Sequence, residues 1–248
     1  MLEEPCVNQA AGLQSLATQL APRLIAVTSH GDQQGELPLL WGLCTRWADM
    51  GLSVAVLDGH TQETAQNPGL TQLLDHPLGR FMEEESPASW SVIPAAAGFV
   101  RLSTGNLLGS KVSELFKHFA VVLVYANASI MAQLLKGSGL TPLLVVPPLR
   151  SSALTAYQAL KQLLLDGQLH PTVANIVLEP TVSAAMPSSL PAQSLLNCAT
   201  TFLGYSAQPL TITASARTDQ SWEDVDRLAL QLLENAVQLE RYPTERAH

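Results

Sequence analysis

The strongest constraint on the fold lies near the start of the chain, where two apolar segments flank a turn and a helix. Residues 24–28 (LIAVT) form an apolar run rich in branched side chains, and residues 53–58 (SVAVLD) form another that ends in a carboxylate. Between them, residues 37–50 carry apolar side chains at helical spacing, and Gly51 follows as a helix stop. Two strands joined through a helix run parallel in one sheet, so this order predicts a βαβ unit.

The alternation of strands and helices continues along the chain. Ser151 stands where a helix N-cap is expected, and residues 181–191, rich in Ser, Ala and Pro, predict a loop. We expect further strands at residues 90–94, 120–125, 142–146, 173–178 and 209–213, and helices at residues 107–119, 151–165, 195–202 and 222–239. The predicted fold is therefore α/β, with a mostly parallel central sheet flanked by helices on both faces.

Composition predicts a single globular domain. A chain of 248 residues can bury about 70–75% of its unfolded surface in one core. Hydrophobic residues make up 47% and charged residues 14%, which suits a buried parallel sheet, although an apolar contact surface explains the same excess equally well. The N-terminus carries Glu3 and Glu4 instead of a basic region, and no apolar run is long enough for a membrane span, so we expect a cytoplasmic protein.

Several function classes are disfavoured by residue usage. A net charge of -8 with dispersed basic residues argues against nucleic-acid binding. Cys6, Cys44 and Cys198 are scattered, without ligand spacing. His30 and His60 could lie near Asp58, but none of the histidines has metal spacing. We therefore expect no metal and no cofactor.

The segment from Ser29 to Leu37 (SHGDQQGEL) occupies the turn between the first strand and the first helix. A glycine-containing turn followed by a helix N-terminus points backbone N–H groups at an anion, and this is how phosphate-binding loops are built. Such a loop needs a lysine, yet Glu36 stands near its end. The chain thus combines the frame of a nucleotide site with residues that oppose its chemistry.

The order of these pieces resembles the opening of the MinD/ParA/FlhG class of P-loop ATPases, which reads roughly IAVTSGKGGVGKT. Residues 26–29 (AVTS) and Gly35 match this pattern. The nucleotide-contacting positions do not match. By the resemblance, the two phosphate-contacting lysines fall on Gly31 and Glu36, the magnesium-binding threonine on Leu37, and the inner glycines on Asp32 and Gln33.

The resemblance predicts further losses beyond the loop. Asp58 matches the first aspartate after the second strand, but the aspartate that orients the attacking water in the class falls on His60. The later Asp-x-x-x-Gly turn falls on residues 125–129 (YANAS), so Tyr125 replaces its aspartate. The adenine-reading asparagine is expected where residues 178–180 (LEP) stand. Each change removes a different part of the nucleotide site.

These substitutions predict a pseudo-ATPase. P-loop hydrolysis depends on positioning and on neutralising the phosphate charge with lysine and magnesium. A carboxylate about 4 Å from a phosphate charge costs roughly 4 kcal/mol at an effective dielectric of about 20, and the lost lysine attraction is of similar size. Together these terms are large enough to abolish micromolar nucleotide binding. The alternative is an ATPase that works through an atypical site.

The segment before the first strand resembles the DQAxxLRxL element that precedes the ATPase core of FlhG, also called FleN or YlxH, the flagellar number regulator. In that family the element binds the GTPase FlhF, and its glutamine stimulates GTP hydrolysis in the partner's site. The aspartate and the arginine of the motif are replaced here. The positions that the resemblance assigns to partner binding are Asn8, Gln9, Ala10, Leu13, Gln14 and Leu16.

The spacing of apolar residues in this N-terminal segment is compatible with two interpretations. Apolar residues recur at steps of three and four, at Val7, Ala10, Leu13, Leu16 and Leu20, and predict one face of a short helix. That helix either binds a partner or packs on its own domain. We therefore expect an N-terminal partner-binding segment at residues 1–22, an α/β domain at residues 23–242 and a disordered tail at residues 243–248.

The C-terminal helix expected at residues 222–239 differs from the membrane-binding helix of FlhG and MinD proteins. Its polar face carries Glu223, Asp224, Asp226 and Glu234 against Arg227. Anionic lipid repels an acidic face, so we expect a helix that covers the core or binds a partner. Nucleotide-driven dimerisation should fail with the loop, which leaves a monomer or a nucleotide-independent dimer.

The resemblance therefore implies a FlhG-like regulator of flagellar number, placement or biosynthesis. Its expected partner is an FlhF-type GTPase or another flagellar or polar protein, which could recruit it to the cell pole or the inner membrane. An accessory protein of polysaccharide secretion, such as cellulose secretion, is a further alternative, since some MinD-like relatives have that role.

Overall fold

The computed structural model describes residues 21–31, 33–76, 89–102, 107–149, 151–178, 190–214 and 218–239. The predicted partner-binding positions from Asn8 to Leu16, the loop residue Asp32, and the tail at residues 243–248 lie outside these ranges. So do residues 179–189, which hold most of the loop predicted at residues 181–191.

Within the described ranges, eight strands form one sheet, in the order β3-β2-β4-β1-β5-β6-β7, with β8 beside β1. All neighbours pair in parallel except β8, which pairs antiparallel with β1. This confirms the predicted α/β fold with a mostly parallel sheet. The strands are β1 (Arg23–Ser29), β2 (Val54–Asp58), β3 (Trp90–Pro94), β4 (Val121–Asn127), β5 (Leu143–Val146), β6 (Thr172–Leu178), β7 (Leu210–Ala214) and β8 (Val237–Gln238).

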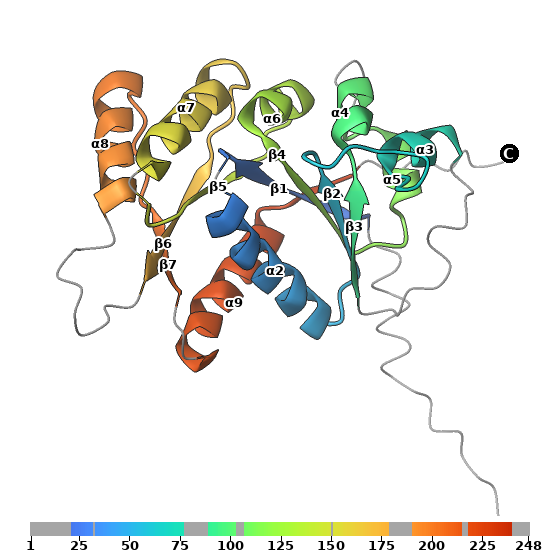
Figure 1. Cartoon of the computed structure of the whole chain (residues 1–248), viewed down its shortest axis with the longest axis horizontal. Helices are drawn as coiled ribbons and strands as arrows, with labels where there is room; N and C mark the ends of the chain where they lie inside the picture. Colours follow the sequence, from blue (N-terminus) through green and yellow to red (C-terminus); the bar gives the residue numbers. More distant parts are fainter. Residues whose placement is uncertain are drawn as a thin grey trace, which may run out of the picture.

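Helices cover both faces of the sheet unequally (Figure 1). One face packs against α3 (Leu70–Asp75), α4 (Ala96–Leu102), α5 (Ser110–Leu115), α6 (Ala128–Leu135), α7 (Ser152–Leu165) and α8 (Leu190–Leu203). The other face packs against α2 (Gln33–Asp49) and α9 (Thr218–Glu234). The central strands are buried on both sides. Residues 121–126 of β4, for example, are all buried, which explains why the sequences of these strands are continuous apolar runs.

Helix α9 belongs to the core. Val225, Leu228, Leu232 and Leu233 are all buried against the α2 side of the sheet. The Trp47 indole N–H on α2 donates to the carbonyl of Ala229 at 3.2 Å. The interpretation of this helix as a cover for the core is confirmed.

Several predicted helices differ from the structure at their ends. Helix α8 begins at Leu190 and not at residue 195, so residues 190–191 of the predicted loop are helical. Helix α9 stops at Glu234, and residues 237–238 then pair with the first residues of β1 instead of continuing the helix to residue 239. β5 pairs with β1 only at Val27 and Thr28, so the backbone groups at the start of β1 are open to β8. The helix predicted at residues 107–119 is limited to α5, because Gly109 at its N-cap has an extended backbone and Phe116 ends it.

Helix α2 begins one turn earlier than predicted. The sequence predicted its start at residue 37, where the resembling class has the helix after its loop, but the helix already includes Gln33, Gly35 and Glu36. Gln33 and Glu36 are good helix formers at positions where the class has glycine and lysine. The connection between β1 and α2 is therefore limited to residues 30–32.

Candidate functional site

The residues of interest gather where parallel strands end at the same edge of the sheet. β1 ends at Ser29, β2 at Asp58, β4 at Asn127 and β5 at Val146. Because β4 lies between β1 and β2 in the sheet, their loops converge although they are far apart in sequence. Parallel α/β sheets place ligand sites at this edge, next to the strands whose connections leave in opposite directions.

The Glu36 side chain lies at the centre of this edge and is fully buried, with 0% of it exposed. Its Oε1 accepts a hydrogen bond from the backbone N–H of His30 at 3.0 Å. Its Oε2 accepts one from the Tyr125 hydroxyl at 2.6 Å. A loop N–H group that could face a bound anion is therefore already paired with a carboxyl group of the same chain.

His30 connects this loop to the neighbouring strand and helix. Its Nε2 lies 2.8 Å from the carbonyl oxygen of Val145 on β5, and its Nδ1 lies 2.8 Å from the Thr155 hydroxyl on α7. A carbonyl only accepts, so Nε2 carries the hydrogen, and in the neutral ring Nδ1 accepts from Thr155. Nε2 also lies 3.4 Å from Oε1 of Glu36. The ring is thus held on both sides, and its side chain is fully buried.

Tyr125 bridges Glu36 and the β2 side of the site. Burial and the hydrogen bond to Glu36 raise the pKa of the Tyr125 phenol well above its ordinary value. The phenol therefore stays protonated across the physiological range and serves as a donor. The ring of His60 lies 4.9 Å from the Tyr125 ring.

Asp58 holds the loop that follows β2. Its carboxylate accepts from the His60 backbone N–H at 2.9 Å and from the Thr61 hydroxyl at 2.5 Å. Within the described part of the chain, Nε2 of His60 is buried and makes no hydrogen bond. Asp58 thus orders its own loop, and His60 places a polar ring beside the Glu36–Tyr125 pair.

The structure brings together only part of the predicted site. Glu36, Asp58, His60 and Tyr125 lie together, as described above. Gly31 has φ of 99°, a left-handed conformation that favours glycine, and its N–H donates to Oγ of Ser29 at 3.3 Å. Gly35 lies inside α2, and Leu37 is 48% exposed. Ser151 is the N-cap residue of α7, as predicted, but its side chain accepts no capping hydrogen bond.

Thr155 and Glu63 are polar contacts of this edge that sequence analysis did not find. Thr155 sits in the first turn of an ordinary amphipathic helix, and no motif marks its contact with His30. Glu63 accepts from the N–H groups of Ala97 (2.7 Å) and Gly98 (2.8 Å) and from the Thr71 hydroxyl (3.0 Å). Burial alone would raise the pKa of Glu63, but these donors outweigh it and lower the pKa below its ordinary value.

A metal centre finds no support among the described residues. No group of three or more His, Cys, Asp or Glu side chains there is arranged to hold an ion. Burial raises the pKa of the Cys44 thiol to about 12, so it stays protonated, and Cys198 is exposed on α8. In the same described part, no helix is both long and apolar enough to cross a membrane.

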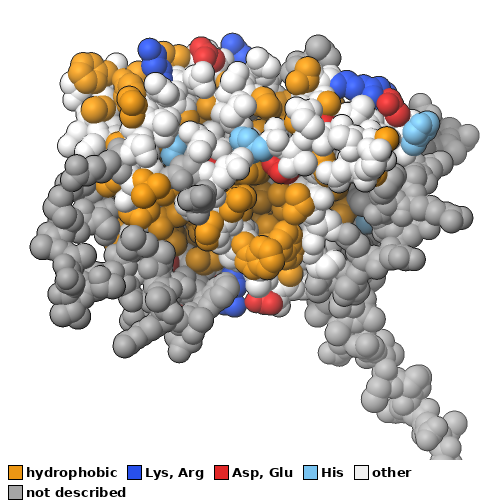
Figure 2. Space-filling view, in the orientation of Figure 1, with side chains coloured by type: hydrophobic (Ala, Val, Ile, Leu, Met, Phe, Trp, Pro, Cys, Tyr) orange, Lys and Arg blue, Asp and Glu red, His pale blue; other side chains and the backbone are white. Residues whose placement is uncertain are grey.

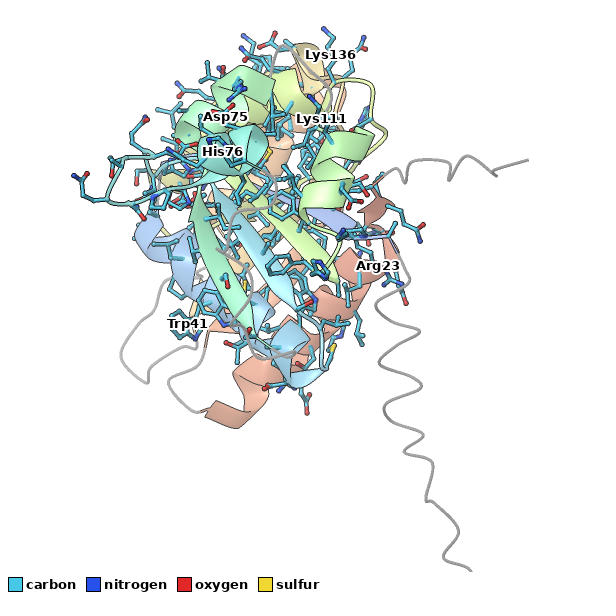
Figure 3. The ribbon with its side chains drawn as sticks, turned by 90° about the vertical axis from the view of Figure 1, so that its right-hand side faces the viewer. Arg23, Trp41, Asp75, His76, Lys111 and Lys136 are labelled. Atoms are coloured by element: carbon cyan, nitrogen blue, oxygen red, sulfur yellow. The ribbon has the colours of Figure 1, made fainter. Side chains whose placement is uncertain are left out.

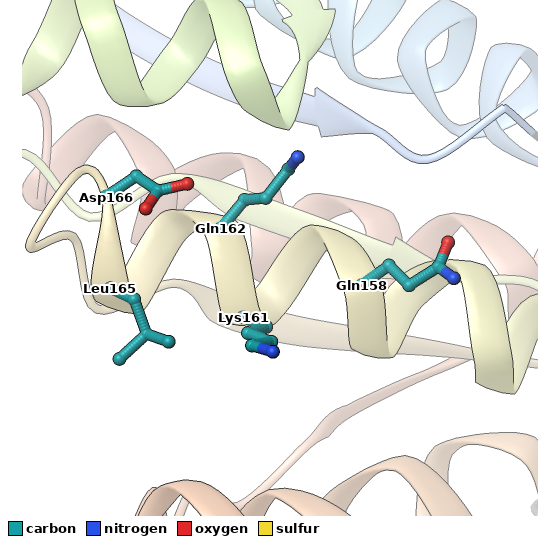
Figure 4. Close-up of a pocket in the computed structure, with 5 residues that line it drawn as sticks. All are labelled: Gln158, Lys161, Gln162, Leu165 and Asp166. Carbon is teal, nitrogen blue, oxygen red and sulfur yellow. The ribbon is translucent and has the colours of Figure 1, made fainter.

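Apolar side chains are exposed on the outer side of α2. Figure 2 shows them gathered over that helix, and Figure 3 shows Trp41 at the margin of the molecule. Trp41 is 63% exposed and packs edge-on against Trp90 of β3, with ring centroids 4.9 Å apart. Exposed tryptophan is a frequent component of protein contact surfaces. A separate surface depression lies along α7, and the described residues that line it are Gln158, Lys161, Gln162, Leu165 and Asp166 (Figure 4).

Comparison with known proteins identifies the fold. No protein-family model matches the chain, and no curated protein matches it. Among solved structures, a plasmid partition protein from Borrelia burgdorferi aligns with a TM-score of 0.54 at 10% identity, over 85% of this chain and 99% of that one. The MinD cell division protein of Aquifex aeolicus aligns with a TM-score of 0.51 at 13% identity, over 88% and 100%.

A ParA family ATPase from Chlorobium tepidum also aligns, with a TM-score of 0.50 at 14% identity, over 85% of this chain and 99% of that one. These three structural neighbours are proteins of the MinD/ParA P-loop ATPase type, and they are similar to this chain over nearly their whole length. At such low identity the likeness concerns the fold.

Proposed function

We propose that this chain is a regulatory protein that uses a MinD/ParA-type fold without nucleotide and acts by binding a protein partner. The observation that carries the proposal is the buried Glu36 carboxyl group, held by the His30 N–H and the Tyr125 hydroxyl. In the resembling class, the matching position is a lysine that contacts phosphate. Here the loop's donor is paired within the chain.

The surrounding geometry supports the same conclusion. A phosphate entering this loop would have to displace Glu36, which would leave both donors without their partner until new bonds form. No lysine follows to neutralise the phosphate, and the position of the magnesium-binding threonine holds an exposed leucine, Leu37. The early start of α2 at Gln33 also shortens the turn that would wrap the phosphates.

The partner assignment rests on the N-terminal resemblance. Residues 8–16 are similar to the FlhF-binding element of FlhG, including Gln9 at the position of the stimulating glutamine. We therefore infer a FlhG-like role in flagellar number, placement or biosynthesis through an FlhF-type GTPase. An amide can act in a partner's site by orienting the attacking water, which requires one correctly placed side chain.

Calorimetric titration with Mg-ATP tests the loss of nucleotide binding. The expected result is no binding heat from the purified full chain under conditions in which a MinD-type ATPase, run in parallel, binds. The Glu36→Gln variant controls for charge alone, and we expect it to remain silent because the lysine and the threonine are still missing. Micromolar binding by the wild type would refute the proposal and favour an atypical ATPase.

The partner is tested by GTPase measurements. Adding the full chain to purified FlhF should change the rate of GTP hydrolysis, and the Gln9→Ala variant should lose most of that change while still binding. Asn197→Ala, a substitution of an exposed α8 residue, is the matched control. Unchanged hydrolysis together with no binding to FlhF would exclude this partner.

A further inference from the structure

We propose that the β1–α2 turn is still an anion-binding site, that its ligand is the Glu36 side chain, and that it accepts a small carboxylate from solution once that side chain is removed. The inference rests on the proposed function, because both treat Glu36 as the permanent occupant of the turn. It adds a ligand class, a monocarboxylate, and a reason why the turn keeps its shape without nucleotide.

The donors of this site are fixed independently of Glu36. Tyr125 lies on the central strand β4 and is 2% exposed. The His30 ring is held by Val145 and Thr155, which places the backbone N–H of the same residue. Removing the carboxyl group should therefore leave the His30 N–H and the Tyr125 hydroxyl still directed at the space it occupied. A buried pair of unsatisfied donors favours binding of an acceptor.

The size of that space selects the ligand. A Glu36→Ala substitution removes Cγ, Cδ and both carboxyl oxygens, and these are the four heavy atoms of acetate. Phosphate is larger and carries more charge, and the described residues around Glu36 supply no lysine or arginine contact to it. Burying that charge without a cationic partner is costly. We therefore expect acetate to bind in preference to phosphate.

The same contacts explain how the occupied site holds neighbouring elements. The turn that donates to Glu36 also reaches β5 and the first turn of α7 through His30. In a nucleotide-dependent switch, a ligand that comes and goes would control such a contact. Here the His30 contacts with Val145 and Thr155 hold the turn to the start of α7 without any exchangeable ligand.

Chemical rescue tests the inference. We would measure thermal unfolding of full-length Glu36→Ala in rising acetate against chloride at matched ionic strength. The expected result is a melting temperature below that of the wild type in chloride, and a saturable recovery of a few degrees in acetate. Hydrogen exchange of the His30 backbone amide should be faster in the variant and should slow again with acetate, whereas exchange at the start of α7 should not change, because Val145 and Thr155 still hold the His30 ring.

Four comparison proteins serve as controls for this experiment. The wild type and Glu36→Gln, whose amide fills the same space, should show no rise specific to acetate. The double variant Glu36→Ala with Tyr125→Phe should recover less, because one donor is gone. Glu114→Ala, a change of an exposed carboxylate on α5, should respond to acetate like the wild type.

If acetate stabilises Glu36→Ala no more than chloride does, or if phosphate stabilises it more than acetate, the inference is wrong. If the variant does not fold in chloride, its circular dichroism after refolding in acetate replaces the melting curve, and failure to recover is equally contrary. Binding of Mg-ATP by the wild type would contradict the proposed function instead, so the two failures are distinguishable.

Discussion

Glu36 and Glu63 perform the same task in two different environments. Both carboxyl groups lie near the carboxyl edge of the sheet and accept backbone N–H groups, Glu36 from the turn after β1 and Glu63 from the start of α4. Glu36 is fully buried and also accepts a hydrogen bond from the Tyr125 hydroxyl, whereas Glu63 is only partly buried. Water can replace Glu63 in part but cannot reach the donors around Glu36.

The difference in solvent exposure gives the hydrogen bonds of these two carboxyl groups different roles. An internal carboxylate that water can replace behaves as a helix cap, with a modest and pH-dependent contribution to stability. One that water cannot replace fixes the identity of its site, because any other ligand must displace it completely.

Glu36→Lys should have the largest effect. It restores the residue that the resembling class has at this position but places a buried cation beside two donors, with no acceptor in place of the carboxyl group. A buried charge without a partner destabilises by roughly 3–5 kcal/mol. Urea unfolding measures the loss, and calorimetry should still find no Mg-ATP binding. A stable, ATP-binding Glu36→Lys protein would show that the remaining loop is a working nucleotide site.

Tyr125→Phe should have the next largest effect. It removes the donor 2.6 Å from Oε2 of Glu36 and leaves a buried oxygen unsatisfied, which costs about 1–3 kcal/mol. Tyr157→Phe, at a partly buried position on α7, is the control and should lose less. Equal losses in urea unfolding would mean that the Tyr125 hydroxyl contributes little to holding Glu36.

Glu63→Gln should cost about 1 kcal/mol at neutral pH and should change the dependence of stability on pH. The pKa of Glu63 is lowered below the ordinary value of 4.5, so its carboxylate stabilises the fold above that pH, and the contribution is lost as pH falls through the folded-state value. The difference in unfolding free energy between wild type and variant should therefore shrink as pH falls below 4.5 and disappear below the folded-state pKa of Glu63. Glu114→Gln is the exposed control, and a gap that widens in acid would contradict the assignment.

Trp41→Ala should have the smallest effect on stability, because the side chain is 63% exposed and lies outside both carboxylate clusters. A surface substitution of this kind usually changes unfolding free energy by less than about 0.5 kcal/mol. If the α2 surface contacts a partner, the variant should lose affinity in a pull-down or titration while its unfolding curve stays in place. Loss of stability above about 1 kcal/mol would instead assign Trp41 to the core.

The fold was largely predictable and the site only in part. Strands β1, β2 and β4 were visible because strands buried on both faces need unbroken apolar runs. The contacts of Glu36 were not visible, because Tyr125 lies 89 positions away along the chain and Thr155 reaches His30 across 125 positions. The predicted ends of helices were wrong where tertiary contacts decide them. For example, strand β8 pairs with β1 in place of the last part of the helix predicted for α9.

The sequence by itself determined the α/β architecture and the absence of the loop lysine, since apolar periodicity and residue identity are local properties of the chain. Only the tertiary structure decided what Glu36 does. A glutamate in that turn could equally have pointed into water. Packing of α2 against the sheet removed it from solvent, and a buried carboxyl group must find donors, which the His30 N–H and the Tyr125 hydroxyl provide.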